Sequence, residues 1–210
     1  MGNCCRSTAK IYFAAHAEHE KMRPVVEALS MRDGEAMHLF MAWERMVEGG
    51  GDSAAVGFPA FVMSLGLPPN KFLLNAFAHG CNVPRQAFPK VKEGAAMSLE
   101  QFLRCATHLL VRNDEGLRTL AFSLYKEEDG DGISVDNANQ LVHDLYQQDR
   151  GAERKIRKAE DIIRETANWD DRANKKRSSS TPFSWEEFNT LVRKNRFIVG
   201  PMYVLSLIHI

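Results

Sequence analysis

The sequence predicts an all-α protein, and three observations carry that prediction. Apolar residues recur at intervals of three and four over long stretches, which is the spacing that lines one face of a helix. Glycine and proline are sparse within those stretches, and extended alternating runs of apolar and polar residues are absent. The chain has 210 residues, 44% of them hydrophobic, so it is long enough to bury a full core as one two-lobed unit.

Four stretches of helical periodicity follow one another along the chain, and each leads into a short segment where a second helix is expected to begin. Phe61, Phe102 and Phe188 stand at the start of the second helix in the first, second and fourth cases. In the third case the second helix carries Leu141 and Leu145. The apolar positions of the four leading helices are Leu39, Phe40, Trp43, Val47; Phe72, Leu73, Ala76, Phe77; Leu117, Leu120, Ala121, Leu124, Tyr125; and Ile156, Ala159, Ile162, Ile163.

The third connection is acidic. Glu127, Asp129 and Asp131 alternate after the helix that ends near Tyr125, so their carboxylates could converge on one centre, and Gly132 allows a sharp backbone turn. Oxygen ligands in this arrangement suit a hard cation such as Ca²⁺ or Mg²⁺. The alternative is an acidic, solvated turn that holds no metal.

The helix–turn–helix units recur about every 36 to 50 residues, which indicates an internal repeat. Each unit resembles an EF-hand, and the four together resemble the calcineurin B-like and neuronal-calcium-sensor branch of that superfamily. The resemblance implies two lobes of paired units, over residues 29–111 and 112–194. Residues 1–28 would form a lipidation segment with a lead-in helix, and residues 195–204 a linker.

The resemblance also implies a ligand set in the third loop, which departs from the family pattern. An EF-hand loop has twelve residues, with glycine at position 6 and a bidentate glutamate at position 12. With Gly132 at position 6, Glu127, Asp129 and Asp131 take positions 1, 3 and 5, and Ala138 takes position 12.

A second register uses the aliphatic residue that family members carry two places after the glycine. If Ile133 is that residue, Asn137 takes position 12. In either register one residue of the loop is missing and no carboxylate closes the site, although Asp136 could substitute after a rearrangement. We therefore expect weak binding of Ca²⁺, or of Mg²⁺, at about 10⁻⁴ M or poorer, or none.

The other three loops are expected to hold no metal. The first, Gly49 to Ala60, ends in a residue without a ligand atom, and the second, Lys90 to Gln101, begins with a cation and ends in an amide. The fourth keeps Glu187 at the closing position. Basic residues and serines precede it, and Asp170 and Asp171 look like remains of its start, displaced by an insertion.

The N-terminus predicts a lipid anchor. Gly2 followed by Cys4 and Cys5 resembles a myristoylation sequence with adjacent palmitoylation sites, although Arg6 stands where Ser or Thr is usual and Ser7 comes one place late. Two acyl chains would anchor the protein durably where one would not. The alternative is an ordinary chain start with two incidental thiols.

Bulk composition narrows the function further. Lys plus Arg and Asp plus Glu both number 27, so no overall field favours nucleic acid. No apolar run is long enough to cross a bilayer and no secretory signal is present, so we expect a cytoplasmic, membrane-associated protein with free buried thiols at Cys81 and Cys105. No nucleophile elbow, phosphate loop or zinc-protease motif occurs, and we expect no enzyme. His16 and His19, three residues apart, are expected on a solvated helix surface.

Two functional hypotheses remain. In the first, the chain is a lipid-anchored regulatory or adaptor protein that binds an amphipathic helix of a protein partner through a hydrophobic groove between its lobes. In the second, it is the N-terminal regulatory region of a larger protein, such as a kinase, a phosphatase or a TLDc-domain protein. The second arises because residues 205–210 resemble the translation of a sequencing-library adapter, so the natural chain is expected to continue beyond Val204.

Overall fold

The structure is a computed structural model of the chain. It describes residues 8, 11–48, 55–64, 66, 69–84, 87–88, 95–111, 113–128, 130–147, 149, 151–170, 175–176 and 181–201. The lipidation residues Gly2, Cys4 and Cys5, the loop residue Asp129 and the adapter-like residues 205–210 lie outside these ranges.

The described chain is mostly helical, which confirms the all-α prediction. A π-helical turn, η2, follows α7, and a 3₁₀ turn, η3, follows α11. The helical elements are α2 (Ala17–Glu20), α3 (Arg23–Ala28), α4 (Asp33–Glu48), α5 (Phe58–Ser64), α6 (Lys71–Gly80), α7 (Leu99–Ala106), η2 (Thr107–Val111), α8 (Asn113–Tyr125), α9 (Val135–Tyr146), α10 (Glu153–Ala167), α11 (Trp185–Lys194) and η3 (Arg196–Val199). The short strands are β1 (Val56–Gly57), β2 (Ala96–Met97), β3 (Trp169–Asp170) and β4 (Lys175–Lys176).

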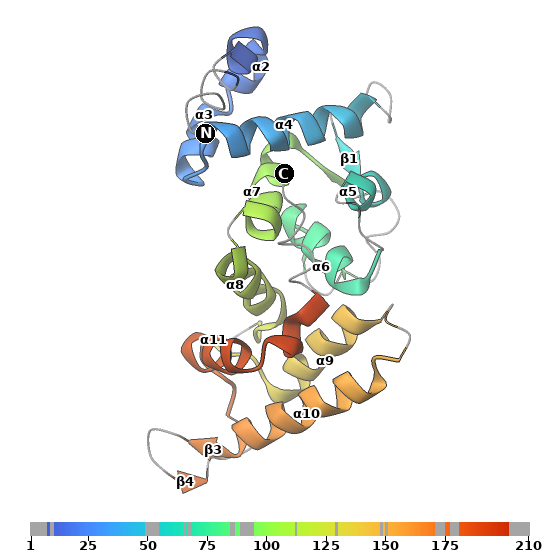
Figure 1. Cartoon of the computed structure of the whole chain (residues 1–210), viewed down its shortest axis with the longest axis vertical. Helices are drawn as coiled ribbons and strands as arrows, with labels where there is room; N and C mark the ends of the chain where they lie inside the picture. The colour runs from blue at the N-terminus through green and yellow to red at the C-terminus, as the bar shows by residue number, and fades with distance from the viewer. Residues whose placement is uncertain are drawn as a thin grey trace.

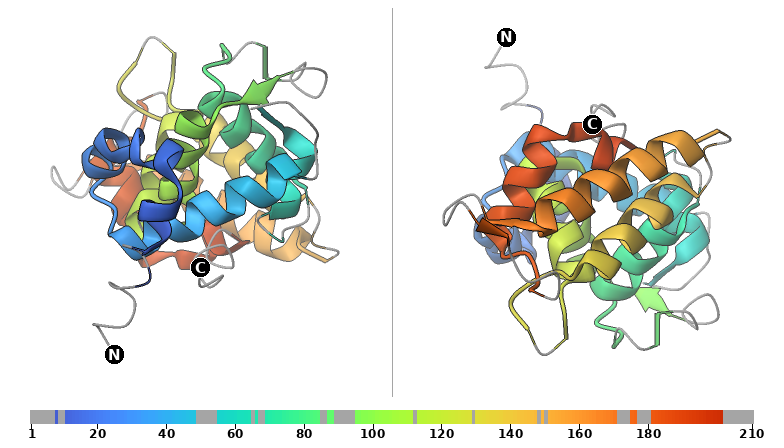
Figure 2. Two further views of the ribbon diagram at one scale, coloured as in Figure 1. Left: turned by 90° about the horizontal axis from the view of Figure 1, so that it is seen from above. Right: turned by 90° about the horizontal axis from the view of Figure 1, so that it is seen from below.

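In Figure 1, α2, α3 and α4 lie at the upper end of the molecule, α6 to α8 in the middle, and α9 to α11 towards the lower end. Helices α2 to α7 form an N-terminal half and α8 to α11 a C-terminal half; in Figure 2, α4 lies in front in the view from above, and α9 and α10 lie in front in the view from below. The halves meet where α6 contacts α8 and α9, and where η2 leads into α8.

Backbone hydrogen bonds join the connecting segments in pairs. Strands β1 and β2 are antiparallel, with Val56 opposite Met97. In the C-terminal half, Ile133 and Phe183 form an antiparallel bridge, in which Ile133 N–H donates to Phe183 O at 2.9 Å and Phe183 N–H donates to Ile133 O at 2.8 Å. The first segment is therefore tied to the second and the third to the fourth.

Gly132 is required at the second of these joins by close packing. A Cβ at this position would lie 2.7 Å from Pro182 Cβ and 2.9 Å from Phe183 O. Real side chains essentially never approach so closely. The glycine thus lets the third segment approach the fourth.

Serine residues cap α7, α9 and α11, which are exit helices, the second helix of each helix–turn–helix unit. Ser98 and Ser184 each accept a hydrogen bond from the backbone N–H three residues later. The side chains of Gln101 and Glu187 in turn accept from the backbone N–H of these serines, which completes a capping box at the start of α7 and of α11. Ser134 caps α9 in the same way, through Asn137 N–H.

Phenylalanines at the starts of the exit helices anchor the core. Phe61, Phe102 and Phe188 are almost fully buried. Phe61 packs against Phe77 with ring centroids 5.4 Å apart and against Phe102 at 6.4 Å. In the C-terminal half, Phe188 lies 5.6 Å from Phe122.

Candidate functional site

The third segment lies between α8 and α9. Tyr125 is the last residue of α8 and Val135 the first of α9. Glu127 N–H donates to Gly132 O at 2.7 Å, which closes the acidic turn across its base. The turn therefore has its own backbone support.

The geometry distinguishes the two loop registers left open by the sequence. Asn137 occupies the third position of its exit helix, as Gln101 and Glu187 do in theirs, and Ile133 bridges to the fourth segment as Val56 bridges to the second. Ala138 instead lies one place later. Asn137 thus corresponds in its place at the start of the helix to Gln101 and Glu187.

In this register a loop of twelve residues begins at Lys126, directly after α8 ends at Tyr125, and Gly132 stands one place later than the glycine of an EF-hand loop. The acidic residues then fall one place away from the positions at which an EF-hand places its ligands. An ammonium group takes the place of the first carboxylate.

Only part of the expected ligand set is brought together. Asn137 Nδ2 donates to Glu127 Oε1 at 3.0 Å, so these two side chains meet directly. Asp131 and Asp136 are exposed, the latter in the first turn of α9. Within the described ranges no group of three or more His, Cys, Asp or Glu side chains is arranged to hold a metal ion.

The closing residues of the second and fourth segments serve as helix caps. Gln101 Oε1 accepts from Ser98 N–H at 2.8 Å, and Glu187 Oε2 accepts from Ser184 N–H at 2.8 Å. Before the fourth segment, β3 and β4 pair antiparallel, with Asp170 opposite Lys175, in the stretch where the sequence suggests an insertion. In both segments, the side chain at the expected closing position therefore caps a helix.

A buried polar network lies beside the third segment, where the two halves meet. The Asp144 side chain, on α9, is almost fully buried and accepts from Tyr125 OH at 2.7 Å and from Gln140 Nε2 at 2.7 Å. Asn75 on α6 donates to Tyr125 OH at 3.1 Å, and Lys71 Nζ lies 3.5 Å from Asp144 Oδ1. The residue that ends α8 is thereby linked to the N-terminal half.

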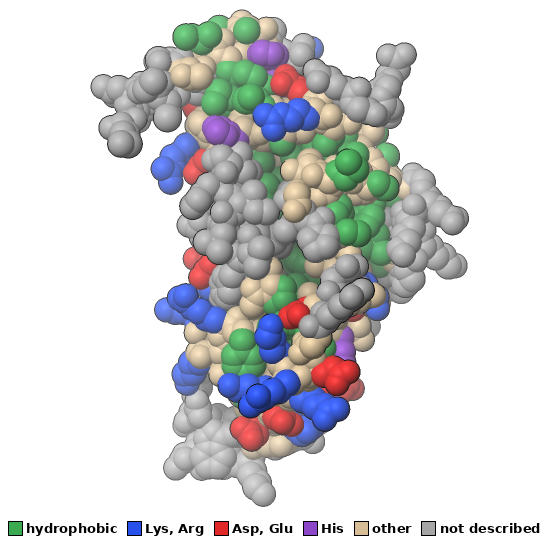
Figure 3. All heavy atoms as spheres, turned by 45° about the vertical axis from the view of Figure 1, so that its right-hand side comes forward, with side chains coloured by type: hydrophobic (Ala, Val, Ile, Leu, Met, Phe, Trp, Pro, Cys, Tyr) green, Lys and Arg blue, Asp and Glu red, His purple; other side chains and the backbone are tan. Residues whose placement is uncertain are grey.

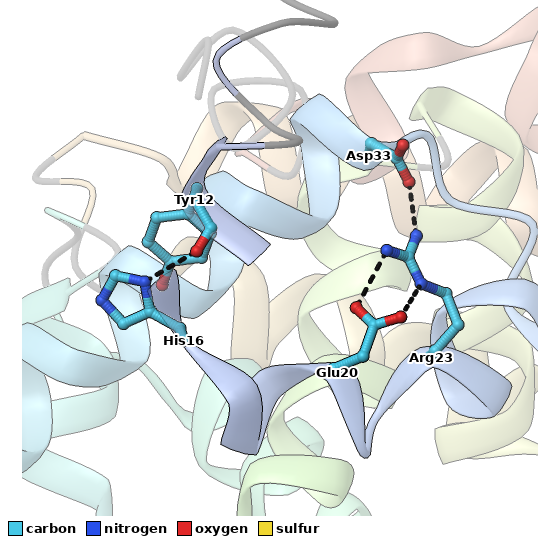
Figure 4. Close-up of polar contacts among 5 residues, drawn as sticks. All are labelled: Tyr12, His16, Glu20, Arg23 and Asp33. Carbon is cyan, nitrogen blue, oxygen red and sulfur yellow. Dashed lines mark hydrogen bonds and ion pairs between the residues drawn. The ribbon is translucent and has the colours of Figure 1, made fainter. Parts of the chain in front are cut away.

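The histidine pair near the N-terminus is placed differently from the expected solvated surface. His19 is 4% exposed and stacks on Phe40 with centroids 4.3 Å apart. His16 Nδ1 lies 2.9 Å from Tyr12 O, as Figure 4 shows, and Nε2 of both histidines lies 3.6 to 3.7 Å from Glu44 Oε1. The three-residue spacing of the histidines could not reveal the burial of His19, because Phe40, on which it stacks, belongs to another helix, α4.

Ion pairs fix the helices beneath this cluster. Arg23 on α3 donates to Asp33 Oδ1 at 2.8 Å and to both oxygens of Glu20, as drawn in Figure 4. The hydrogen bond to Glu20 is the main reason that the pKa of Arg23 is raised. This clamp joins α2, α3 and the start of α4.

A cavity of about 860 Å³ opens above α4. Its walls come from the helical residues near the N-terminus, from α4, and from the ends of α5, α7 and η2. We call it the apolar groove, and its lining residues are Thr8, Ile11, Tyr12, Ala15, His16, Met37, His38, Met41, Ala42, Arg45, Ser64, Phe102 and Leu110. On the face in Figure 3, hydrophobic side chains gather over the upper part of the molecule and charged ones over the lower part, where α10 lies.

The two described cysteines are free and chemically quiet. Burial raises the pKa of the Cys81 thiol to about 11 and that of the Cys105 thiol to about 12. A nucleophilic cysteine needs a lowered pKa, because the thiolate is the reacting species. These thiols therefore remain protonated near neutral pH.

Comparison with known proteins assigns the chain to no family. A scan against models of protein families finds no match, and neither does a search of curated protein sequences. Among the helices of the described ranges, none combines the length and the apolar character needed to cross a membrane.

Proposed function

We propose that this chain is a regulatory or adaptor module of EF-hand type, with two lobes of paired helix–loop–helix units, that binds an amphipathic helix of a partner protein in the apolar groove. The volume and apolar lining of the groove are the observation that carries the proposal. The pairing of the segments through Val56–Met97 and Ile133–Phe183 supports the assignment of units. An amphipathic helix binds such a groove by inserting its apolar face.

The lining of the groove favours a particular kind of helix. Met37 and Met41 offer flexible, polarisable side chains that adapt to different apolar surfaces. The lining side chains that carry or can gain a positive charge are Arg45, His16 and His38. A partner helix with glutamates at the borders of its apolar face would complement them, and one bordered by lysines would not.

A peptide titration tests this function. Two dansyl-labelled helical peptides share one leucine face, bordered by glutamate in one and by lysine in the other. We expect the glutamate peptide to bind saturably and more tightly. Met41→Glu should abolish its binding, whereas Met63→Glu, at an 80% exposed position on α5, should not. Equal binding of both peptides, or loss with both variants, would contradict the proposal.

The third unit is proposed to bind Ca²⁺ or Mg²⁺ weakly, at about 10⁻⁴ M or poorer, with the other three units structural. Its ligands would be drawn from Glu127, Asp129, Asp131, Asp136 and Asn137. Binding must displace the hydrogen bond between Asn137 and Glu127, which is one reason to expect weakness. Calorimetry at millimolar Ca²⁺ tests the site. The wild-type chain should give a heat of binding that Asp129→Ala removes, and a titration without such a heat would refute the site.

Membrane attachment is proposed through lipid on Gly2, Cys4 and Cys5. Cells expressing the chain should incorporate labelled myristate, and Gly2→Ala should prevent it. Palmitate label should depend on Cys4 and Cys5. A wild-type chain that takes up no myristate would end this part of the proposal while leaving the groove untouched.

A further inference from the structure

A second cavity, of about 510 Å³, lies in the C-terminal half between α8, α11 and η3. Its lining is polar, unlike that of the apolar groove, and we call it the arginine pocket. Its lining residues are Asp114, Glu115, Arg118, Asn189, Arg193 and Arg196. Three guanidinium groups from three separate elements thus face one space, against two carboxylates from the first turn of α8.

Arg118 is the central residue of this pocket. Its side chain is on α8, the residue is only 9% exposed, and its Nε donates to Asn189 Oδ1 at 2.7 Å. That bond fixes the plane of the guanidinium and leaves its terminal nitrogens available to the cavity. A buried cation is costly unless an anion accompanies it.

The carboxylates of the pocket do not supply that anion. Asp114 and Glu115 lie one helical turn before Arg118, a spacing at which helical ion pairs commonly form. Among the described residues, however, neither carboxylate forms an ion pair with Arg118 or Arg193. The guanidinium of Arg118 points to an amide instead, so its charge is left for a ligand.

We propose that the arginine pocket binds the phosphate group of a small phosphomonoester. Planar guanidinium groups donate pairs of parallel hydrogen bonds to phosphate oxygens, and three of them can surround one group. A phosphate carries a charge of about −1.5 to −2 at neutral pH, so it gains more from charged hydrogen bonds to guanidinium groups than a carboxylate does. The volume lies in the range of about 300 to 1,000 Å³ typical of small-molecule sites, which leaves space for the organic part.

The two carboxylates have a role in the same arrangement. They lower the field of the pocket, which limits non-specific attraction of anions. They also provide hydrogen-bond acceptors for hydroxyl groups on the organic part of the ligand. The site lies in the other half of the molecule from the apolar groove and does not depend on the function proposed for it.

The test uses the full chain, with inorganic phosphate and phenyl phosphate as probes at constant ionic strength. We expect saturable shifts of the arginine Nε–Hε resonances, with phenyl phosphate competing for the same site. The double variant Arg193→Gln/Arg196→Gln removes two exposed cations and should weaken both ligands about tenfold or more, because charged hydrogen bonds to the phosphate are lost. Arg157→Gln, an exposed arginine on α10, is the matched control and should change nothing.

Three results would overturn the proposal. Shifts that never saturate would leave no specific site. An effect of Arg157→Gln equal to that of the double variant would indicate general charge attraction. Acetate binding as tightly as phosphate would make the pocket a carboxylate site. Circular dichroism of each variant establishes that folding is intact. Arg118→Lys keeps the charge but loses the planar guanidinium, and it should also weaken phosphate binding.

Discussion

Removing the hydroxyl of Tyr125 tests whether the buried network holds the two halves together. The change Tyr125→Phe keeps a ring that is 2% exposed and deletes one short hydrogen bond to a carboxylate. Hydrogen bonds to charged groups contribute about 1.5 to 3 kcal/mol, and Asn75 also loses an acceptor. We expect the free energy of unfolding to fall by about 2 kcal/mol.

A double-mutant cycle isolates the interaction. Tyr125→Phe is combined with Asp144→Asn, and each free energy of unfolding is measured in urea. We expect a coupling energy of about 1.5 kcal/mol, since contacting residues in one network couple by about 0.5 to 3 kcal/mol. Asp161→Asn, at an exposed position on α10, should combine additively with Tyr125→Phe. A coupling below about 0.5 kcal/mol between Tyr125 and Asp144 would refute the reasoning.

Two further predictions concern glycine packing and a buried thiol. Gly132→Ala should destabilise the fold by about 1 to 3 kcal/mol, because the added Cβ would meet Pro182 at 2.7 Å; Gly34→Ala, with nothing within 4 Å, should be neutral or slightly stabilising in the same urea unfolding series. Cys105 holds its proton in the folded state up to a pKa of about 12, against 9.0 ordinarily, so the folded state binds more protons than the unfolded state in this interval. The free energy of unfolding should therefore fall as pH rises from 9 towards 12, and Cys105→Ala should reduce this fall. An equal fall in the variant would show that the Cys105 thiol does not cause it.

Helices and core were accessible from the sequence because local periodicity determines them. Phe61, Phe102 and Phe188 lie in or near the starts of α5, α7 and α11, where the sequence places them, and they are buried there. The register of the third loop was not accessible, since Gly132 suggested one alignment and Ile133 another. The bridge from Ile133 to Phe183, a contact over a long stretch of chain, and the start of α9 at Val135 favour the second alignment.

Sites built across the fold were missed for the same reason. Asp144 lies one helical turn after Leu141 on the buried face of α9, which was a usable signal for a buried carboxylate. The arginine pocket gave none, because Arg118 and Asn189 come from distant segments and each alone looks like an ordinary surface residue. His19 is buried because it stacks on Phe40 of α4, a contact that helical spacing within its own segment does not encode.

Methyl NMR of the methionines tests the central claim most directly. The chain contains nine methionines, and two of them, Met37 and Met41, line the apolar groove. With ¹³C-methyl-methionine protein, addition of the glutamate-bordered peptide should shift the Met37 and Met41 signals and leave that of exposed Met63 in place. Unchanged Met37 and Met41 signals under conditions where the peptide binds would place the binding elsewhere and contradict the proposed function.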